Sequence, residues 1–324
     1  MTEYDYSDGA RQNNAKQLHT AIAKAVKDRG ESLYLLVDPA SLPADIDIPH
    51  VQALVAEHPV PVILLHESLT RDSDPWLINI EMDKPQHVPL LEISIGFALN
   101  ELHTDHLGQG NGRAVCGWLL SPFDAETVAR QLGNTAIQSL SDHSQILLRY
   151  YDPIVHSVLW SHFSALQHQR WLGVLSHWLY PDGDGQIITR EHTPVSSPFL
   201  SFSLALSPED EAMFDATGKV NRTLERHRSL HINHHRHGEV EAVVIVSQAL
   251  ERASSQHGFN YERDQQLLAL DCLHWHPQFN THPDVRILLS RRERDLRASY
   301  TDCLASLNKA RYPQLCNELN ERNQ

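Results

Sequence analysis

The chain has 324 residues, of which 41% are hydrophobic and 21% are charged, so it has enough apolar material for a core and is not of the disordered class. At roughly 150 residues per domain, this length predicts about two domains or lobes. The net charge is −14, from 27 Lys and Arg against 41 Asp and Glu, which is the opposite of the balance typical of a nucleic-acid-binding protein.

The first predicted element is a helix over residues 14–29, with Leu18, Ile22 and Val26 on one face and Gly30 after its end. Short apolar runs, each close to a proline or glycine, then predict four strands. They cover residues 32–40, 59–67, 89–95 and 112–122. A helix is also expected over residues 51–58.

The alternation continues beyond this point. Asp124 is a plausible N-cap for a helix that Gly133 would end. Residues 145–153 predict a fifth strand, Pro153 begins another helix, and residues 171–185 predict a strand or a pair closed by a turn. Alternating strands and helices predict an α/β lobe, a mixed sheet with flanking helices, over residues 1–200.

After Pro208 the pattern changes to helical periodicity only, which predicts an all-helical lobe over residues 205–324. The Pro- and Ser-rich segment 192–203 is the expected connection. The acidic, polar N-terminus does not resemble a secretory signal, and no apolar stretch approaches 18 residues. Four cysteines without a CxxC pair favour reduced thiols. We therefore expect a cytoplasmic protein without a membrane partner.

Two histidine clusters are the main candidates for metal chemistry. The first comprises His227, His231, His234, His235 and His237, and the second comprises His274, His276 and His282 with Asp284. His231 and His235 have the HxxxH spacing of zinc enzymes, but Ile232 stands where such enzymes carry the catalytic glutamate. Solvated or loop histidines are the simpler interpretation. We predict no catalytic, cofactor or metal residues, and no nucleophile motif is present.

The segment RRERDLR, residues 291–297, predicts a charged helical face. Glu293 and Arg297 would pair at i,i+4 on such a helix. A solvated face is the simpler interpretation, and the alternative is a patch that docks an acidic protein surface through Arg291, Arg294 and Arg297.

The segment RYYDP, Arg149 to Pro153, follows the apolar run that ends at Leu148. Asp152 can cap the helix that Pro153 begins, and Arg149 can bind a nearby carboxylate through two hydrogen bonds. Tyr150 and Tyr151 would add apolar area with a polar tip at the edge of the lobe. The segment predicts a stiff strand-to-helix corner and does not require catalysis.

Arg149, Tyr151, Asp152 and Pro153 resemble the Arg-x-aromatic-Asp-Pro signature of the effector adaptor-chaperone family of bacterial type VI secretion, first catalogued as a domain of unknown function. A second stretch is similar to the C-terminal pattern of that family. Its matching residues are Gly258, Asp264, Phe279 and Pro283.

The resemblance implies an adaptor that is not an enzyme. Such a protein binds a toxic effector, through the N-terminal segment of the effector, and hands it to the spike-tip protein. An effector helix in a groove or a strand added to a sheet edge are the expected binding modes. Two alternatives stay open at this point: an immunity protein that neutralises a toxin, and a metal-dependent hydrolase that uses the histidine clusters.

Overall fold

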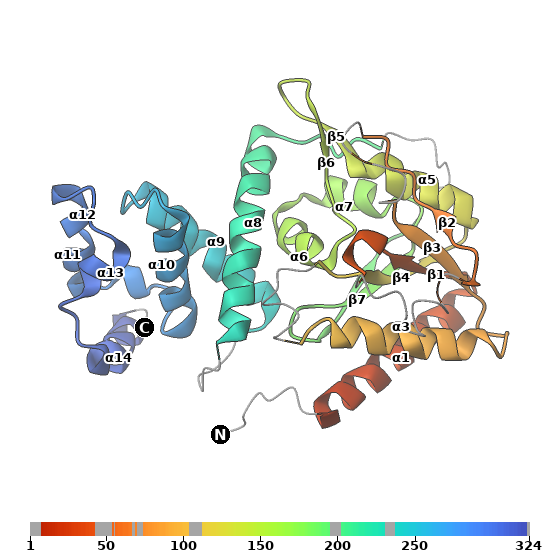
Figure 1. Cartoon of the computed structure of the whole chain (residues 1–324), viewed down its shortest axis with the longest axis horizontal. Helices are drawn as coiled ribbons and strands as arrows, with labels where there is room; N and C mark the ends of the chain where they lie inside the picture. The colour runs from red at the N-terminus through yellow and green to blue at the C-terminus, as the bar shows by residue number, and fades with distance from the viewer. Residues whose placement is uncertain are drawn as a thin grey trace. The chain divides into compact units, whose positions relative to one another are not determined.

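A computed structural model describes residues 8–42, 54, 56–66, 69, 74–103, 112–194, 202–230 and 237–322 (Figure 1). The chain divides into two compact units, Thr2–Phe214 and Asp215–Gln324. They are called the N-terminal unit and the C-terminal unit below. The division falls inside a single helix, α8 (Pro208–Ser229).

The N-terminal unit is built on a six-stranded sheet in which every pairing is antiparallel. Its strand order is β2-β3-β1-β4-β7-β8. The strands are β1 (Ser32–Val37), β2 (Val60–Pro61), β3 (Trp76–Ile80), β4 (Val115–Ser121), β7 (His177–Pro181) and β8 (Ile187–Glu191). The central strands β1 and β4 are almost entirely buried, because helices cover both faces of the sheet.

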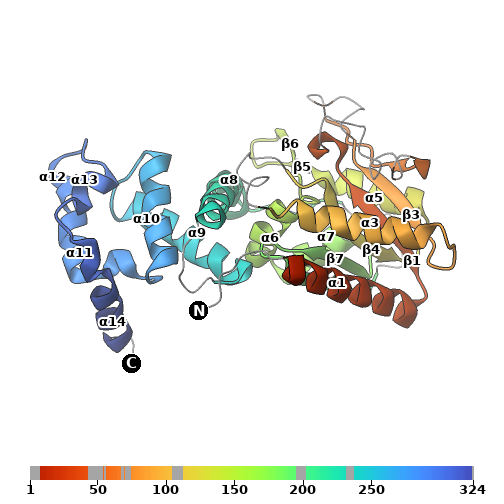
Figure 2. The same ribbon diagram turned by 60° about the horizontal axis from the view of Figure 1, so that its bottom comes forward.

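Helices α1 (Asp8–Arg29) and α3 (His87–Asn100) cover one face of the sheet (Figures 1 and 2). Leu18 and Ile22 of α1 join Leu91 and Ile95 of α3 against Trp118 of β4. These apolar side chains are all at most 2% exposed, and such burial is the main source of stability in a core of this kind.

Helices α5 (Ala125–Ala136), α6 (Pro153–His162) and α7 (Ala165–Leu172) cover the other face. The core on this side is rich in large aromatic side chains. Tyr150 lies edge-on against Trp171 and Trp178, with ring centroids 5.0 and 5.9 Å away. Two short strands, β5 (Ile137–Ser139) and β6 (Gln145–Leu147), form a separate antiparallel pair beside this layer.

Four sequence-based predictions in this unit are wrong or only partly right. The strand expected over residues 59–67 is reduced to the two residues of β2. Residues 89–95 lie in α3 rather than in a strand, because a short apolar run is compatible with either element. The predicted fifth strand is reduced to β6, outside the main sheet. Gly133 does not end its helix. It lies inside α5, where a side chain would overlap the carbonyl oxygen of Ile63.

The C-terminal unit contains only helices among its described elements. Beyond α8 these are α9 (Glu239–Ser255), α10 (Glu262–His274), α11 (Pro283–Leu289), α12 (Arg291–Arg294), α13 (Tyr300–Leu304) and α14 (Tyr312–Arg322), with short 3-10 turns at Phe279–Thr281 and Lys309–Arg311. A sheet with flanking helices followed by a helical region confirms the predicted fold class. Within the described ranges, no helix has the length and apolar character needed to cross a bilayer.

Candidate functional site

The segment Arg149–Pro153 forms the corner at which the chain enters α6. The Asp152 side chain accepts a hydrogen bond from the amide of Ile154 at 3.0 Å, so it caps the helix. Pro153 occupies the first helical position, where its missing amide is not needed. The amide of Asp152 in turn donates to the carbonyl oxygen of Arg149 at 3.0 Å, which closes the turn.

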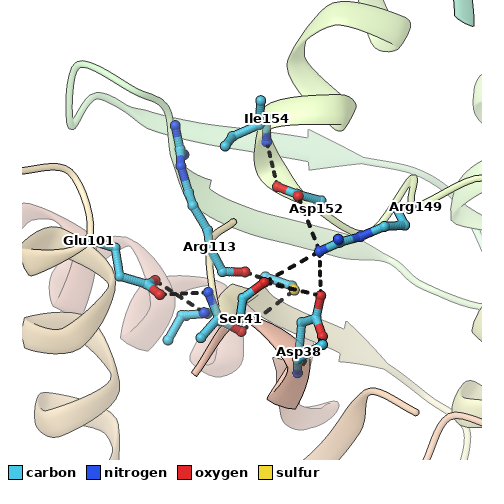
Figure 3. A network of polar contacts seen from close by, with 11 residues as sticks. Asp38, Ser41, Glu101, Arg113, Arg149, Asp152 and Ile154 are labelled. Atoms are coloured by element: carbon cyan, nitrogen blue, oxygen red, sulfur yellow. Dashed lines mark hydrogen bonds and ion pairs between the residues drawn. The ribbon is translucent and has the colours of Figure 1, made fainter. Parts of the chain in front are cut away.

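Arg149 joins this corner to the end of β1, more than a hundred residues earlier in the chain (Figure 3). Its Nη2 atom lies 2.5 Å from Asp38 Oδ2, 3.5 Å from Asp152 Oδ2 and 3.4 Å from Ser41 Oγ. The arginine side chain is 39% exposed, whereas that of Asp38 is 2% exposed and that of Asp152 is 9% exposed. The guanidinium is therefore a partly exposed cation between two buried carboxylates.

Burial and ion pairing have opposite effects on the pKa values of the three charged groups at the corner. Burial raises the pKa of Asp38 and of Asp152, and the charge of Arg149 opposes the rise in both. Burial alone would lower the pKa of Arg149, but Asp152 and Asp38 together leave it raised. Each charge thus depends on the others, because an isolated charge is costly at such depth.

A third buried carboxylate lies close to the corner (Figure 3). Glu101, just after α3, accepts hydrogen bonds from the amides of Ala114 at 2.6 Å and Val115 at 3.2 Å. Burial raises the pKa of Glu101 to about 8, against the two backbone hydrogen bonds and the charge of Arg113. The Arg113 Nη1 atom donates to the carbonyl oxygen of Pro181 at 2.9 Å. Glu101 therefore fixes the start of β4 to the end of α3.

Tyr150 and Tyr151 are core residues, not the lobe-edge residues that the sequence predicts. They are 0% and 3% exposed, and burial raises the pKa of both phenols. The Tyr150 hydroxyl donates to the carbonyl oxygen of Leu132 at 3.4 Å. The two rings anchor the corner in the aromatic core, so the segment can hold its shape.

This arrangement suits mechanical support better than chemistry. The guanidinium of Arg149 is already bound by two carboxylates, which leaves it poorly placed to bind an anionic ligand. The Asp38 and Asp152 carboxylates in turn accept backbone amides, from Ala40 and Ile154. The corner links the end of β1, the 3-10 turn Pro39–Ser41 that follows it and the start of α6 into one polar network.

The four C-terminal motif residues lie in the C-terminal unit and also have local roles there. Gly258, with φ of +65°, reverses the chain after α9, a backbone conformation that favours glycine. Asp264 is 6% exposed, and its Oδ1 atom accepts the amide of Tyr300 at 3.0 Å. Phe279 is fully buried, with its ring centroid 4.9 Å from that of Tyr312, and Pro283 is the first residue of α11.

The predicted arginine patch is not on one continuous helix. Helix α12 ends at Arg294, so Glu293 and Arg297 lack the helical spacing for an i,i+4 pair. Arg291 and Arg297 are exposed, and the side chain of Arg294 lies outside the described residues. Arg292, which the sequence did not single out, is 5% exposed and donates to the carbonyl oxygens of Gly258, Leu296 and Ala298.

The histidine clusters are rearranged by the fold. His231, His234 and His235 lie outside the described residues. His227 of α8 and His274 of α10, one from each cluster, are hydrogen-bonded at 2.8 Å between Nδ1 and Nε2. Within the described part of the chain, no three His, Cys, Asp or Glu side chains are grouped to hold a metal ion.

His276 and His282 serve their own loop. His276 Nδ1 accepts the amide of Gln278 at 3.1 Å. His282 Nδ1 accepts the amide of Asp284 at 3.2 Å at the start of α11, and its Nε2 lies 3.0 Å from Glu318. Neither role requires a metal ion.

Sequence reasoning missed Asp38, Glu101 and Arg113 as members of the polar network. One signal for Asp38 was present. The chain contains Asp-Pro steps at Asp38, Asp74 and Asp152, and each aspartate accepts a backbone amide at 3.0 Å. The Asp-Pro steps at Asp38 and Asp152 therefore indicated two locally capped corners, although not that Arg149 would join them, and Asp74 instead accepts the amide of the distant Leu64.

Comparison with known families finds one match. Residues 33–170, less than half of the chain, match a family model described as "Domain of unknown function (DUF4123)". The matched range contains the Arg149–Pro153 corner together with Asp38, Glu101 and Arg113, and it ends before Gly258. No curated protein matches the chain, and no solved structure matches it.

Proposed function

We propose that this protein is an adaptor chaperone of bacterial type VI secretion. In this role it binds a toxic effector in the cytoplasm and loads it onto the spike-tip protein for export. The observation that carries the proposal is the family match over residues 33–170, which includes the Arg149–Pro153 corner. The family description itself states no activity, so the adaptor role rests on the resemblance of this corner to the adaptor signature.

The geometry of the corner supports a recognition role rather than a chemical one. Its charged groups bind one another and the backbone, and its tyrosines are buried in the core. A rigid sheet with a braced corner is a suitable scaffold for holding a partner segment, because binding to a preorganised surface costs less ordering entropy.

The sheet also offers a physical route for binding an extended segment. The five-residue strand β8 is at the edge of the sheet and pairs with β7 on one side. At the two ends of this pairing, the amide of Asp182 donates to the carbonyl oxygen of Gln186, and the amide of His192 donates to the carbonyl oxygen of Ser176. Hydrogen-bonded and non-hydrogen-bonded pairs alternate along an antiparallel ladder. The backbone N–H and C=O groups of Ile187, Thr189 and Glu191 therefore point away from β7. A partner strand could add to these groups by β-augmentation.

The test is co-expression of the full chain with the proteins encoded beside it, followed by affinity capture and size exclusion. A stable complex with a neighbouring toxin, lost when the N-terminal segment of the toxin is deleted, is the expected result. Toxin activity is then assayed with the chain added: an immunity protein abolishes it, whereas an adaptor need not. A monomeric chain and toxins that stay soluble without it would contradict the proposal.

A further inference from the structure

The C-terminal unit contains a basic segment in an otherwise acidic protein. Residues 285–311 carry seven Lys and Arg and three Asp and Glu, whereas the whole chain carries 27 and 41. Such a local reversal of charge sign creates a positive potential over one part of the surface. The side-chain contacts show which of these cations are available to a partner.

Several arginines of the unit already have oxygen partners. Arg222 pairs with Glu262, Arg228 with Glu239 and Arg311 with Asp284. Arg252 donates to the Asn280 side chain and to the carbonyl oxygen of Pro277, and Arg292 donates to three backbone carbonyls. These side chains support the fold.

Arg286, Arg291 and Arg297 differ from that group. All three are exposed, and among the described residues no carboxylate pairs with any of them. Arg291 donates to the carbonyl oxygen of Asp302 at 3.2 Å, and its charge helps to lower the pKa of the nearby Asp302 carboxyl group without forming an ion pair with it. Exposed cations on one short segment that form no ion pair are suited to binding carboxylates.

Two of the most exposed apolar side chains of the protein lie in the same segment. Ile287 is 65% exposed and Leu296 is 74% exposed. Ile287 and Arg291 are four residues apart across the junction of α11 and α12, where Ser290 keeps a helical backbone, so both side chains lie on one face.

The turn that carries Leu296 and Arg297 is held in place. Arg292 reaches from α12 to the carbonyl oxygens of Leu296 and Ala298, and the amide of Arg297 donates to Asp295 Oδ1 at 3.0 Å. The exposed side chains are therefore presented by a fixed backbone, which lowers the entropic cost of binding.

We propose that Arg286, Ile287, Arg291, Leu296 and Arg297 form a docking surface for an acidic segment of the effector. This proposal rests on the proposed adaptor function. The segment would carry Asp or Glu beside aliphatic or aromatic side chains, with carboxylates on the arginines and apolar groups on Ile287 and Leu296. A nucleic acid fits less well, because it would leave the two apolar side chains unused and meet a protein of net charge −14.

The test compares three double variants of the full chain in capture of the neighbouring toxin. Arg291→Glu with Arg297→Glu should weaken binding about tenfold and make it less sensitive to salt. Ile287→Ser with Leu296→Ser should weaken binding severalfold without changing the salt dependence. Arg263→Glu with Arg322→Glu is the matched control, because it makes the same charge change at exposed positions of the same unit and should bind as the unaltered chain does. Equal binding by all variants would overturn the docking surface while leaving the adaptor role intact.

If the unaltered chain captures no toxin, that result counts against the adaptor role alone. A peptide measurement then tests the docking surface by itself. The probes are two fluorescent peptides, one of alternating Glu and Leu pairs and the other of alternating Lys and Leu pairs. Their binding to the chain is measured by fluorescence anisotropy. The Glu–Leu peptide should bind the unaltered chain and lose affinity with Arg291→Glu and Arg297→Glu. Equal binding of both peptides, tighter binding of duplex DNA, or dimerisation of the chain through this surface would overturn it.

Discussion

Each compact unit uses a buried carboxylate to hold the backbone of a distant segment, but the surroundings differ. In the N-terminal unit, Glu101 accepts two amides beside Arg113, and Arg149 lies between two further buried carboxylates. In the C-terminal unit, Asp264 accepts the amide of Tyr300 at 3.0 Å at the first turn of α10. The comparison indicates that removing one charged side chain lowers the free energy of unfolding most where buried charges compensate one another.

The largest effect is expected for Arg149→Ala. This change leaves the carboxylates of Asp38 and Asp152 buried without their cation, and we expect a loss of about 3 kcal/mol in the free energy of unfolding at pH 7. That value is at the low end for a buried pair because the arginine is partly exposed. The loss should shrink in acid, as both carboxyl groups become protonated. Urea unfolding at pH 7 and pH 4 measures it.

Lys24→Ala is the control for this variant, because it breaks an exposed ion pair with Asp28 and should change stability little. Normal folding of Arg149→Ala combined with loss of partner binding would show that the corner is a contact surface and not a brace.

Glu101→Gln tests the third buried carboxylate and should lower the free energy of unfolding by about 2 kcal/mol. A carboxyl group offers acceptor oxygens to both amides, whereas glutamine turns an NH2 group toward one of them. The pKa of Glu101 rises on folding from 4.5 to about 8, so the folded state binds more protons. The contribution of this raised pKa to the free energy of unfolding is therefore complete below pH 4.5 and is lost as the pH rises to about 8.

Unfolding measured between pH 5 and pH 8 should therefore show a fall in stability that Glu101→Gln reduces. Glu92→Gln, at an exposed position of α3, the helix that Glu101 follows, is the matched control and should keep the slope. An unchanged slope in Glu101→Gln would contradict the assignment of the raised pKa to this carboxyl group.

His156→Phe probes a buried ionisable group that lacks a charge partner. His156 is 0% exposed, its ring nitrogens have no hydrogen-bond partner among the described residues, and its ring lies within about 5 Å of those of Trp171, Trp178 and Tyr180. Burial, with smaller contributions from Arg190 and His168, lowers its pKa well below 6.5. The unfolded chain therefore binds the extra proton, and stability falls as the pH drops below 6.5.

From pH 6.5 to pH 5 this group should cost up to about 2 kcal/mol, a loss that phenylalanine removes. Thermal unfolding at pH 5 and pH 7.5 measures the difference. An unchanged difference in stability between pH 5 and pH 7.5 in the variant would contradict the expectation.

The smallest effect, about 1 kcal/mol, is expected for Asp264→Asn. The amide keeps an acceptor for Tyr300, and only the favourable charge at the start of α10 is lost. Urea unfolding at pH 7 compares it directly with Glu101→Gln. An equal or larger loss for Asp264→Asn would contradict the distinction between the two units.

The local part of the fold followed from the sequence, and the long-range part did not. Strand β1, strand β4 and the Asp152 cap depend on near neighbours, so the apolar runs and the Asp-Pro step were sufficient. The run at residues 89–95 became α3 because only packing on the sheet decides between a helix and a strand for a short apolar segment. Strand β3, which lies between β2 and β1, was not predicted, because its five residues follow a segment without a clear hydrophobic pattern.

The candidate site shows the same division. That Arg149 would bind a carboxylate was predictable from its position beside Asp152. Its partner Asp38 follows the end of β1, more than a hundred residues earlier in the chain, so only the tertiary fold brings the two side chains together. Arg292 is one of four arginines that look equivalent in the sequence. Among those whose side chains the structure describes, it alone is buried and donates to three carbonyl groups.

The position of the unit boundary inside α8 has a consequence for the design of fragments. Met213 and Phe214, on the first two turns of that helix, pack against the aromatic core of the N-terminal unit, and Asp210 accepts a hydrogen bond from Gln167 of α7 at 2.9 Å. A fragment cut at the Pro- and Ser-rich segment near residue 200 would lose all three residues. The N-terminal unit should therefore be expressed with the beginning of α8 attached, and a fragment that ends before it should be prone to aggregation.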